Sequence, residues 1–264
     1  MARWHYQRAL SEKPQGQVWL VRSEHGRTGY FKFVHEDQWP YAGPFIANEF
    51  ITAALARRLG FPVAALEVAD VAGPDGIWQH GIVSIAATSP EVLPWADAPP
   101  EVRRRPEAWL RNVERLCQLV VFDAWTVNVD RATDRNLILH RDHGDSRYDW
   151  YLIDHSLCLL GAPYKWASRD WRDPYWMNLW KYHHVPEGLL RLQSDWRALR
   201  PMVERIQQLS RSVVDEAIAT APAGSLPPDQ ARQTRNLLLY RQRHLERIIR
   251  LWLAHPGVKE YRPH

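Results

Sequence analysis

Two short apolar runs, LIL and WYLI, stand out in residues 121–160, and the polar, glycine-containing stretch HRDHGDSRYD separates them. Runs of this length, divided by a turn, are typical of two buried strands of a hairpin. Asp130 and Asn136 precede the first run, and Asp154 directly follows the second. Because the start of one hairpin strand lies beside the end of the other, we expect these three side chains at one end of the hairpin.

The three residues have the composition that phosphoryl transfer from ATP requires: one carboxylate beside the hydroxyl nucleophile, and an amide and a second carboxylate on magnesium. Asp130 is the candidate for accepting or orienting the hydroxyl proton. Asn136 and Asp154 are the candidate metal ligands, since a carboxylate at the end of a buried strand costs free energy unless it is paired or bound to a metal. Asp154 alone also fits the N-cap of the next segment, so the prediction depends on the combination.

The rest of the chain divides into a strand-rich part and a helix-rich part. Apolar stretches with glycine-containing turns predict five strands before residue 90, and the segment EFITAALARRL predicts one helix that Gly60 and Pro62 end. The proline-rich residues 88–106 predict a linker. The later sequence is rich in helix formers and i,i+4 charge pairs. The predicted strands span residues 4–10, 18–23, 29–34, 63–71 and 78–86. The predicted helices span residues 49–59, 109–127, 194–221 and 228–254, of which the last two have the clearest pattern.

The predicted fold class is therefore α+β, with two lobes. Residues 1–90 would form a small β-rich lobe with one helix that binds nucleotide, and residues 91–106 the linker. Residues 107–264 would form a larger, mainly helical catalytic lobe that holds the polar hairpin. This is the architecture of a bilobal protein-kinase-like fold.

Lys32 lies in the third predicted strand, GYFKF, and a lone lysine on a half-exposed strand is usually only solvated. Glu49, however, opens the next predicted helix, and kinases hold the lysine that binds the α- and β-phosphates with such a helix glutamate. Glu49 is also suited to a helix N-terminus with Asn48 as N-cap. The turn at Gly16 is the candidate phosphate-covering loop, although it has a single glycine and fits an ordinary hairpin turn equally well.

Charge and cysteine content narrow the partners. The net charge is +4 and the pI about 9.1, and because the charge is spread, nucleotide phosphate is a sufficient partner while nucleic acid is allowed but not required. The two cysteines form no CxxC pair, which argues against a zinc site and a disulfide framework and favours a cytoplasmic setting. The first residues lack the apolar core of a signal peptide, and no run approaches the roughly 18 apolar residues of a membrane helix, so no membrane partner is expected.

The segments NVDRATDRNLIL and WYLIDHS resemble the catalytic block of the HipA-like kinases and, more distantly, that of the phosphatidylinositol 3/4-kinases. Upstream, QVWLVRSEHGRTGYFKF and NEFITAALARRLGFPVAALEVADV resemble the hairpin, lysine strand and following helix and strand of the HipA-like pattern. The resemblance covers residues of about 10–165. By this match the nucleotide-binding ion pair is Lys32 and Glu49, the catalytic residue is Asp130, and the metal ligands are Asn136 and Asp154.

The resemblance also implies ATP and Mg²⁺ as cofactors, adenine between the lobes near residues 82–86, and a Ser or Thr hydroxyl of a protein as the acceptor. A lipid head group or a small alcohol is an alternative acceptor, and a non-catalytic nucleotide-binding or partner-binding module is an alternative function. Two features depart from the family pattern. Asn136 follows Asp130 by six residues where most kinases have five, and no His or Lys follows Arg131 in the loop.

Overall fold

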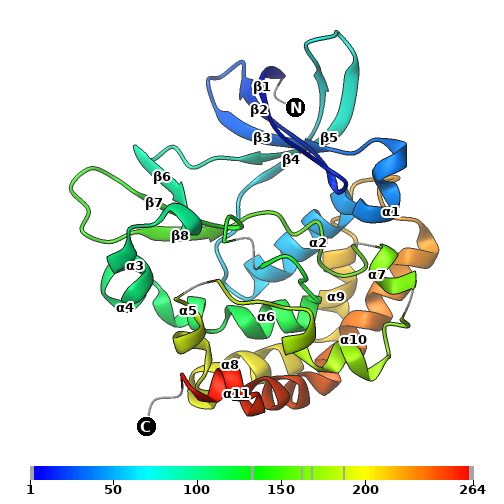
Figure 1. Cartoon of the computed structure of the whole chain (residues 1–264). Coiled ribbons are helices and arrows are strands. Elements are labelled where there is room, and N and C mark those ends of the chain that lie inside the picture. The colour runs from blue at the N-terminus through cyan, green and yellow to red at the C-terminus, as the bar shows by residue number, and fades with distance from the viewer. Residues whose placement is uncertain (1–2, 132–133, 162, 168, 187, 262–264) are drawn as a thin grey trace.

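Five antiparallel strands form the sheet of the smaller lobe in the computed structural model, which describes residues 3–131, 134–161, 163–167, 169–186 and 188–261 (Figure 1). Each strand overlaps a predicted one, Gly16 begins β2 directly after the first turn, and Gly26 lies in the turn between β2 and β3. The spatial order is β1-β2-β3-β5-β4. The strands are β1 (Trp4–Lys13), β2 (Gly16–Ser23), β3 (Thr28–Phe33), β4 (Leu66–Ala72) and β5 (Trp78–Ile85).

β3 separates the core of the small lobe from the junction with the large lobe. Phe31 and Phe33 are 0% and 1% exposed and pack against Trp19 of β2, because alternate side chains of a strand share one face. Lys32 lies on the opposite face, as the alternation of side chains along a strand requires. Its side chain is only 14% exposed, so the expected half-exposed, solvated position is wrong. The large lobe covers it.

α2 (Phe45–Arg58) crosses from β3 to β4 after η1 (Glu36–Gln38) and α1 (Trp39–Ala42). It begins directly after Pro44, four residues earlier than predicted, because its first turn is apolar and buried in the core. Glu49 therefore lies in the second turn and not at the helix N-terminus. Gly60, with φ 79°, follows the helix end as predicted.

The proline-rich stretch expected to be a linker is largely structured. β6 (Glu91–Pro94) pairs with β7 (Leu137–Arg141), and β7 pairs with β8 (Asp149–Leu152), which confirms the predicted hairpin. η2 (Trp95–Asp97) and α3 (Pro100–Arg104) follow β6, and buried Trp95 holds this segment on the large lobe. Proline is tolerated here because it occupies a strand end and first helical turns.

Three short helices replace the single helix predicted over residues 109–127. They are α4 (Pro106–Trp109), α5 (Val113–Cys117) and α6 (Leu119–Thr126). Leu110 is extended and bridges to Tyr148, and Asn112 is left-handed with φ 51°, so the helical path is broken between α4 and α5. Gln118 separates α5 from α6. All eight residues of α6 are buried, which places this helix at the centre of the large lobe.

α10 (Pro228–Ala254) is the second helix around which the large lobe packs, and it has the predicted bounds. It packs on α6, α8 and α9 through side chains such as Leu237, Leu238 and Leu245, all 0% exposed. The helix predicted over residues 194–221 is divided into α8 (Trp196–Gln207) and α9 (Arg211–Ile218), because extended Ser210 begins a new helix. The remaining elements are α7 (Pro163–Ala167), η4 (Pro174–Met177), η5 (Leu179–Lys181), η6 (Leu190–Gln193) and α11 (Pro256–Lys259). Within the described ranges, no helix is long and apolar enough to cross a membrane.

Candidate active site

The five side chains predicted to carry the chemistry come from both lobes and lie near one another at the lobe junction. Lys32 lies on β3, Glu49 on α2, Asp130 and Asn136 between α6 and β7, and Asp154 directly after β8. Burial alone would lower the pKa of Lys32, but Asp154, Glu49 and Asp130 together raise it. All three carboxylates therefore lie within electrostatic reach of one ammonium group.

Lys32, Asp154 and Ser156 form a closed triangle of hydrogen bonds. Lys32 Nζ donates to Asp154 Oδ1 at 2.8 Å and to Ser156 Oγ at 2.6 Å, and Ser156 Oγ donates to Asp154 Oδ1 at 2.7 Å. Burial would raise the pKa of Asp154, but the charge of Lys32 and the two hydrogen bonds hold it well below its usual range. Asp154 is therefore an anion at neutral pH. The sequence reasoning did not identify Ser156 as part of the site.

Glu49 is paired with His155 and not with Lys32. The distance from His155 Nδ1 to Glu49 Oε2 is 3.6 Å, and both side chains are almost fully buried. Among the ion pairs of the described residues, none joins Lys32 to Glu49. Glu49 acts on Lys32 only as a nearby charge, so the direct pair that the family resemblance implies is not formed in this arrangement.

Asp130 and Asn136 form the second half of the site. Asn136 Nδ2 donates to both the backbone oxygen and Oδ2 of Asp130, each at 3.2 Å, so the six-residue spacing still brings the two side chains together. Burial raises the pKa of Asp130, and the neighbouring charge of Asp154 adds to that rise. Lys32 opposes both effects. A carboxylate with a raised pKa is suited to accepting a proton.

Asp154 and Asn136 each have a side-chain oxygen of the type that binds magnesium. Within the described residues, no donor is bonded to Asp154 Oδ2 or to Asn136 Oδ1. One carboxylate and one amide oxygen make up a hard donor set, and Mg²⁺ in nucleotide enzymes typically takes one or two such ligands plus substrate phosphates. The described residues contain no cluster of three His, Cys, Asp or Glu side chains that would hold a metal without a nucleotide.

A buried ion pair fixes the loop that carries Asp130 and Asn136. Asp123 of α6 accepts from Arg131 Nε and Nη2, both at 3.0 Å, and from Asn128 Nδ2 at 2.9 Å. Arg131 Nη1 also donates to the backbone oxygen of Asn136 at 3.1 Å. The Asp123 and Arg131 side chains are each 1% exposed. The pair therefore ties α6 to both ends of the loop.

His183 contacts two members of this network, Asn128 and Asp123. Its Nδ1 donates to the backbone oxygen of Asn128 at 3.1 Å, and Nε2 lies 4.0 Å from Asp123 Oδ2. Burial lowers the pKa of His183, so it is neutral at neutral pH. The sequence analysis missed Asp123 and His183. The signal for Asp123 was available, since an aspartate inside the apolar helix LVVFDAWT must be paired if that helix is buried.

One residue of the candidate site and one residue near it have left-handed backbone conformations. Asp154 has φ 53°, and Val127, which directly precedes Asn128, also has φ 53°. A β-branched residue in this region is a real outlier and costs on the order of 1–3 kcal/mol. Surrounding contacts hold both conformations, including the bond from Leu159 N to Thr126 O at 2.6 Å. Backbone strain of this kind is concentrated at functional sites.

Gly16 begins β2 and lies close to Phe33 and Val34, where β3 ends. It has φ 129°, and an added Cβ would lie 2.8 Å from Phe33 O and 2.9 Å from Val34 Cγ1. The glycine is therefore required by the close approach of two backbones. Gln38 Nε2 donates to Lys13 O at 2.8 Å and holds the same turn. A phosphate-binding role of Gly16 stays a prediction.

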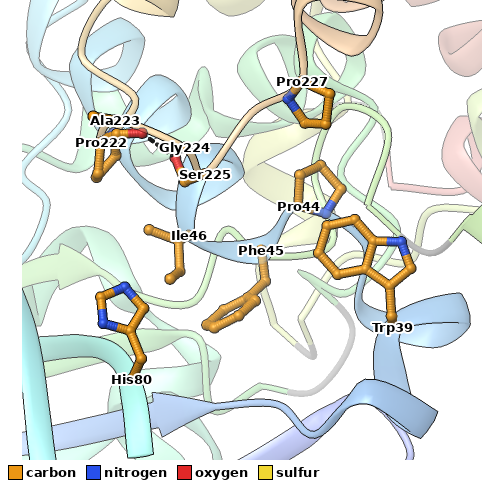
Figure 2. A pocket seen from close by; sticks show the side chains of 10 residues that line it. All are labelled: Trp39, Pro44, Phe45, Ile46, His80, Pro222, Ala223, Gly224, Ser225 and Pro227. Atoms are coloured by element: carbon orange, nitrogen blue, oxygen red, sulfur yellow. Dashed lines mark hydrogen bonds between the residues drawn. The ribbon is translucent and has the colours of Figure 1, made fainter.

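A separate apolar pocket of about 350 Å³ lies beside α2, one turn ahead of Glu49 (Figure 2). Trp39, Phe45 and Ile46 face the loop of residues 222–227 that joins α9 to α10. None of the five predicted side chains lines this pocket, so it is distinct from the candidate active site.

Comparison with known proteins extends the description of the fold. No protein-family model matches the chain, and no curated protein matches it. The crystal structure of the Helicobacter pylori proinflammatory kinase CtkA superposes with a TM-score of 0.52 at 13% sequence identity, over 98% of this chain and 96% of that one. The Golgi casein kinase with Mn and ADP gives 0.49 at 11% identity, over 98% and 74% of the two chains. The Rio2 kinase of Chaetomium thermophilum, in an ADP/Mg²⁺-phosphoaspartate complex, gives 0.43 at 14% identity, over 90% and 70%. The likeness to CtkA confirms the predicted α+β, bilobal protein-kinase-like fold.

Proposed function

We propose that the chain is an ATP- and Mg²⁺-dependent phosphotransferase of the HipA-like type, with a Ser or Thr hydroxyl of a protein as acceptor. The observation that supports it most is the convergence of Lys32, Asp130, Asn136 and Asp154 at the lobe junction of a kinase-like fold. A β-strand ammonium, a proton-accepting carboxylate and two oxygen ligands are the components of phosphoryl transfer.

Each residue has a role in this proposal that follows from its environment. Asp130 accepts or orients the acceptor hydroxyl proton, because its pKa is raised and the side chain is fixed by Asn136. Asn136 and Asp154 hold the metal, which neutralises charge on the transferred phosphoryl group. Lys32 binds the α- and β-phosphates. Adenine lies between the lobes near residues 82–86, above the apolar cluster of Ala64, Ile138 and Tyr151.

Nucleotide binding requires one exchange of partners. Lys32 Nζ donates to Asp154 Oδ1, and Glu49 lies 3.6 Å from His155. If the Lys32 ammonium donated to a phosphate oxygen, Asp154 would be free to bind the metal. Glu49 is close enough to act on Lys32 and would then orient it. The pair inferred from the family resemblance is thus proposed for the nucleotide-bound state.

The direct test is transfer of labelled phosphate from ATP to proteins of a lysate, with acceptor sites identified by peptide mass spectrometry. Asp130→Asn should abolish transfer and leave nucleotide binding nearly intact, because it removes only the proton-accepting charge. Asp154→Asn should abolish metal-dependent binding. Asp142→Asn, the same change on an exposed turn residue, serves as the control and should be silent. Interchanged behaviour of the Asp130 and Asp154 variants would refute the assignment of roles.

The pairing of Lys32 with Asp154 favours a second candidate, a nucleotide-binding module without catalysis, because the lysine ammonium is bonded to Oδ1, one of the two oxygens of the proposed metal ligand. This candidate predicts a Mg-ATP thermal shift with no transfer to protein, lipid or small alcohols. Transfer to lipid or alcohol alone would keep the chemistry and reject the protein acceptor.

A further inference from the structure

The C-terminal half of α10 carries a ridge of arginines on the large lobe. In Figure 1 this part of the helix lies at the bottom of the large lobe, on the side away from the five-stranded sheet. Arg243 lines two hollows there, with volumes of about 430 and 470 Å³. Arg172 lines one of them, and Arg247 and Arg250 line the other. We call these four arginines the α10 basic surface.

Most of this positive charge is not balanced by carboxylates. The acidic residue that lines the hollows, Glu246, is bonded to Arg250 at 2.7 Å. Within the described residues, Arg172, Arg243 and Arg247 form no ion pair with a carboxylate. Two other arginines of α10 have partners, since Arg241 donates to Ala124 O at 2.7 Å and Trp176 O at 2.8 Å, and Arg235 is paired with Asp215. In the described part of the chain, three of the four arginines of the α10 basic surface therefore have no carboxylate partner.

Two of the guanidinium groups are held in position by tryptophan rings. Arg172 lies over Trp171 at 4.5 Å from the ring centroid, and Arg250 lies over Trp196 at 4.3 Å. Stacking fixes the planar guanidinium and reduces the entropy lost when it binds a carboxylate in the bidentate manner. Arg243 and Arg247 are like charges at i,i+4, an arrangement that slightly destabilises a helix. The surface therefore combines ordered donors with a small cost to stability.

The spacing of the arginines identifies the kind of partner. With a helical rise of about 1.5 Å per residue, Arg243 and Arg247 are about 6 Å apart along the axis. An extended peptide rises about 3.3 Å per residue, so carboxylates at alternate positions lie about 6.6 Å apart. Leu251, 42% exposed beside these arginines, adds an apolar contact. We infer that the α10 basic surface binds an extended acidic peptide with carboxylates at alternate positions and an apolar residue at one end.

The covered aromatic rings favour a peptide over single-stranded nucleic acid. Bases bind such surfaces by stacking on open aromatic faces. Here the faces of Trp171 and Trp196 are covered by arginines, and Tyr240 packs against Trp171 and His244, at centroid distances of 5.3 and 4.5 Å. The inference goes beyond the proposed phosphotransfer, and its test measures binding without turnover.

The test is fluorescence anisotropy of the full chain with a labelled twelve-residue peptide that alternates Glu and Ser and ends in Leu. Arg243→Glu with Arg247→Glu should weaken binding at least tenfold, and affinity should fall as salt rises. The double change keeps a like-charge pair at i,i+4, so helix stability should be conserved, and an unchanged melting temperature checks this. Arg8→Glu with Arg22→Glu is the matched control, because it alters net charge equally at exposed arginines of the small-lobe sheet.

Three outcomes would overturn the inference. No saturable peptide binding at 1 mM peptide would show that the surface does not bind acidic peptides. Equal weakening by the two double variants would show that net charge alone is responsible. Tighter binding of a labelled oligonucleotide than of the peptide, lost in the Arg243 and Arg247 variant, would assign the surface to nucleic acid.

Discussion

Removing one partner of the buried Asp123–Arg131 pair should destabilise the protein strongly. In Asp123→Leu, the Arg131 guanidinium stays 1% exposed but loses the acceptor of two of its three described hydrogen bonds. Breaking a buried pair from one side costs about 3–5 kcal/mol, because a buried charge is left uncompensated. For a chain of this size, about 2–4 °C per kcal/mol converts that cost to a melting temperature lower by roughly 6–20 °C.

The double variant makes the prediction specific. Arg131→Met should cost a similar amount, since it leaves the Asp123 carboxylate buried. Asp123→Leu with Arg131→Met removes both charges and should be less destabilised than either single variant, because neither charge remains unpaired. The coupling free energy from urea unfolding should exceed about 2 kcal/mol, within the range for residues in direct contact. If the losses of unfolding free energy in the two single variants added up to the loss in the double variant, the pair would not act as a unit.

In the same set of variants, phosphotransfer activity should be lost even where the fold is retained. The double variant lacks the bond from Arg131 to the Asn136 backbone oxygen, so it should lose phosphotransfer although it folds. As a matched control, Asp97→Leu with Arg135→Met alters an exposed pair, 54% and 64% exposed, in the same way. Exposed pairs contribute little, so its melting temperature should hardly change. Full activity in the buried double variant would refute the positioning role.

Three further predictions concern the candidate site. Mg-ATP should raise the melting temperature and ATP with excess EDTA should not, because the oxygen donors of Asp154 and Asn136 suit a hard divalent ion. Equal shifts of the melting temperature under the two conditions would contradict the metal assignment. In a Lys32→Ala and Glu49→Ala cycle, the losses of ATP affinity should be much less than additive, because Glu49 acts on Lys32 as a nearby charge and would orient it on the phosphates. Additive affinity losses would reject the pair. The pKa of Asp154 is lowered on folding, so its pairing with Lys32 stabilises the protein above the unfolded-state pKa of about 3.9, and this contribution disappears as pH falls through the lower folded value. In urea unfolding between pH 2.5 and 7, Lys32→Met should therefore lose less free energy of unfolding on acidification than the unchanged protein. An identical loss in the two proteins would contradict the pairing.

The sequence by itself determined those features that depend on local pattern. Period-two alternation fixed which face of β3 carries Lys32, and two short apolar runs fixed the β7–β8 hairpin that brings Asn136 and Asp154 to one end. Strong helix formers and i,i+4 charge pairs predicted the bounds of α10. These choices involve neighbours within a few residues, so they can be derived without knowledge of the distant chain.

Tertiary structure decided which partners the charged groups take. The pattern of residues suggested a Lys32–Glu49 pair, but Lys32 is bonded to Asp154 and Ser156, more than 120 residues away, and Glu49 lies 3.6 Å from His155. Burial of the first turn of α2 moved its start ahead of Glu49, and buried Trp95 turned an expected linker into part of the large lobe. Ion pairing depends on distances between separate elements and on desolvation, and neither is encoded in the spacing of residues along the chain.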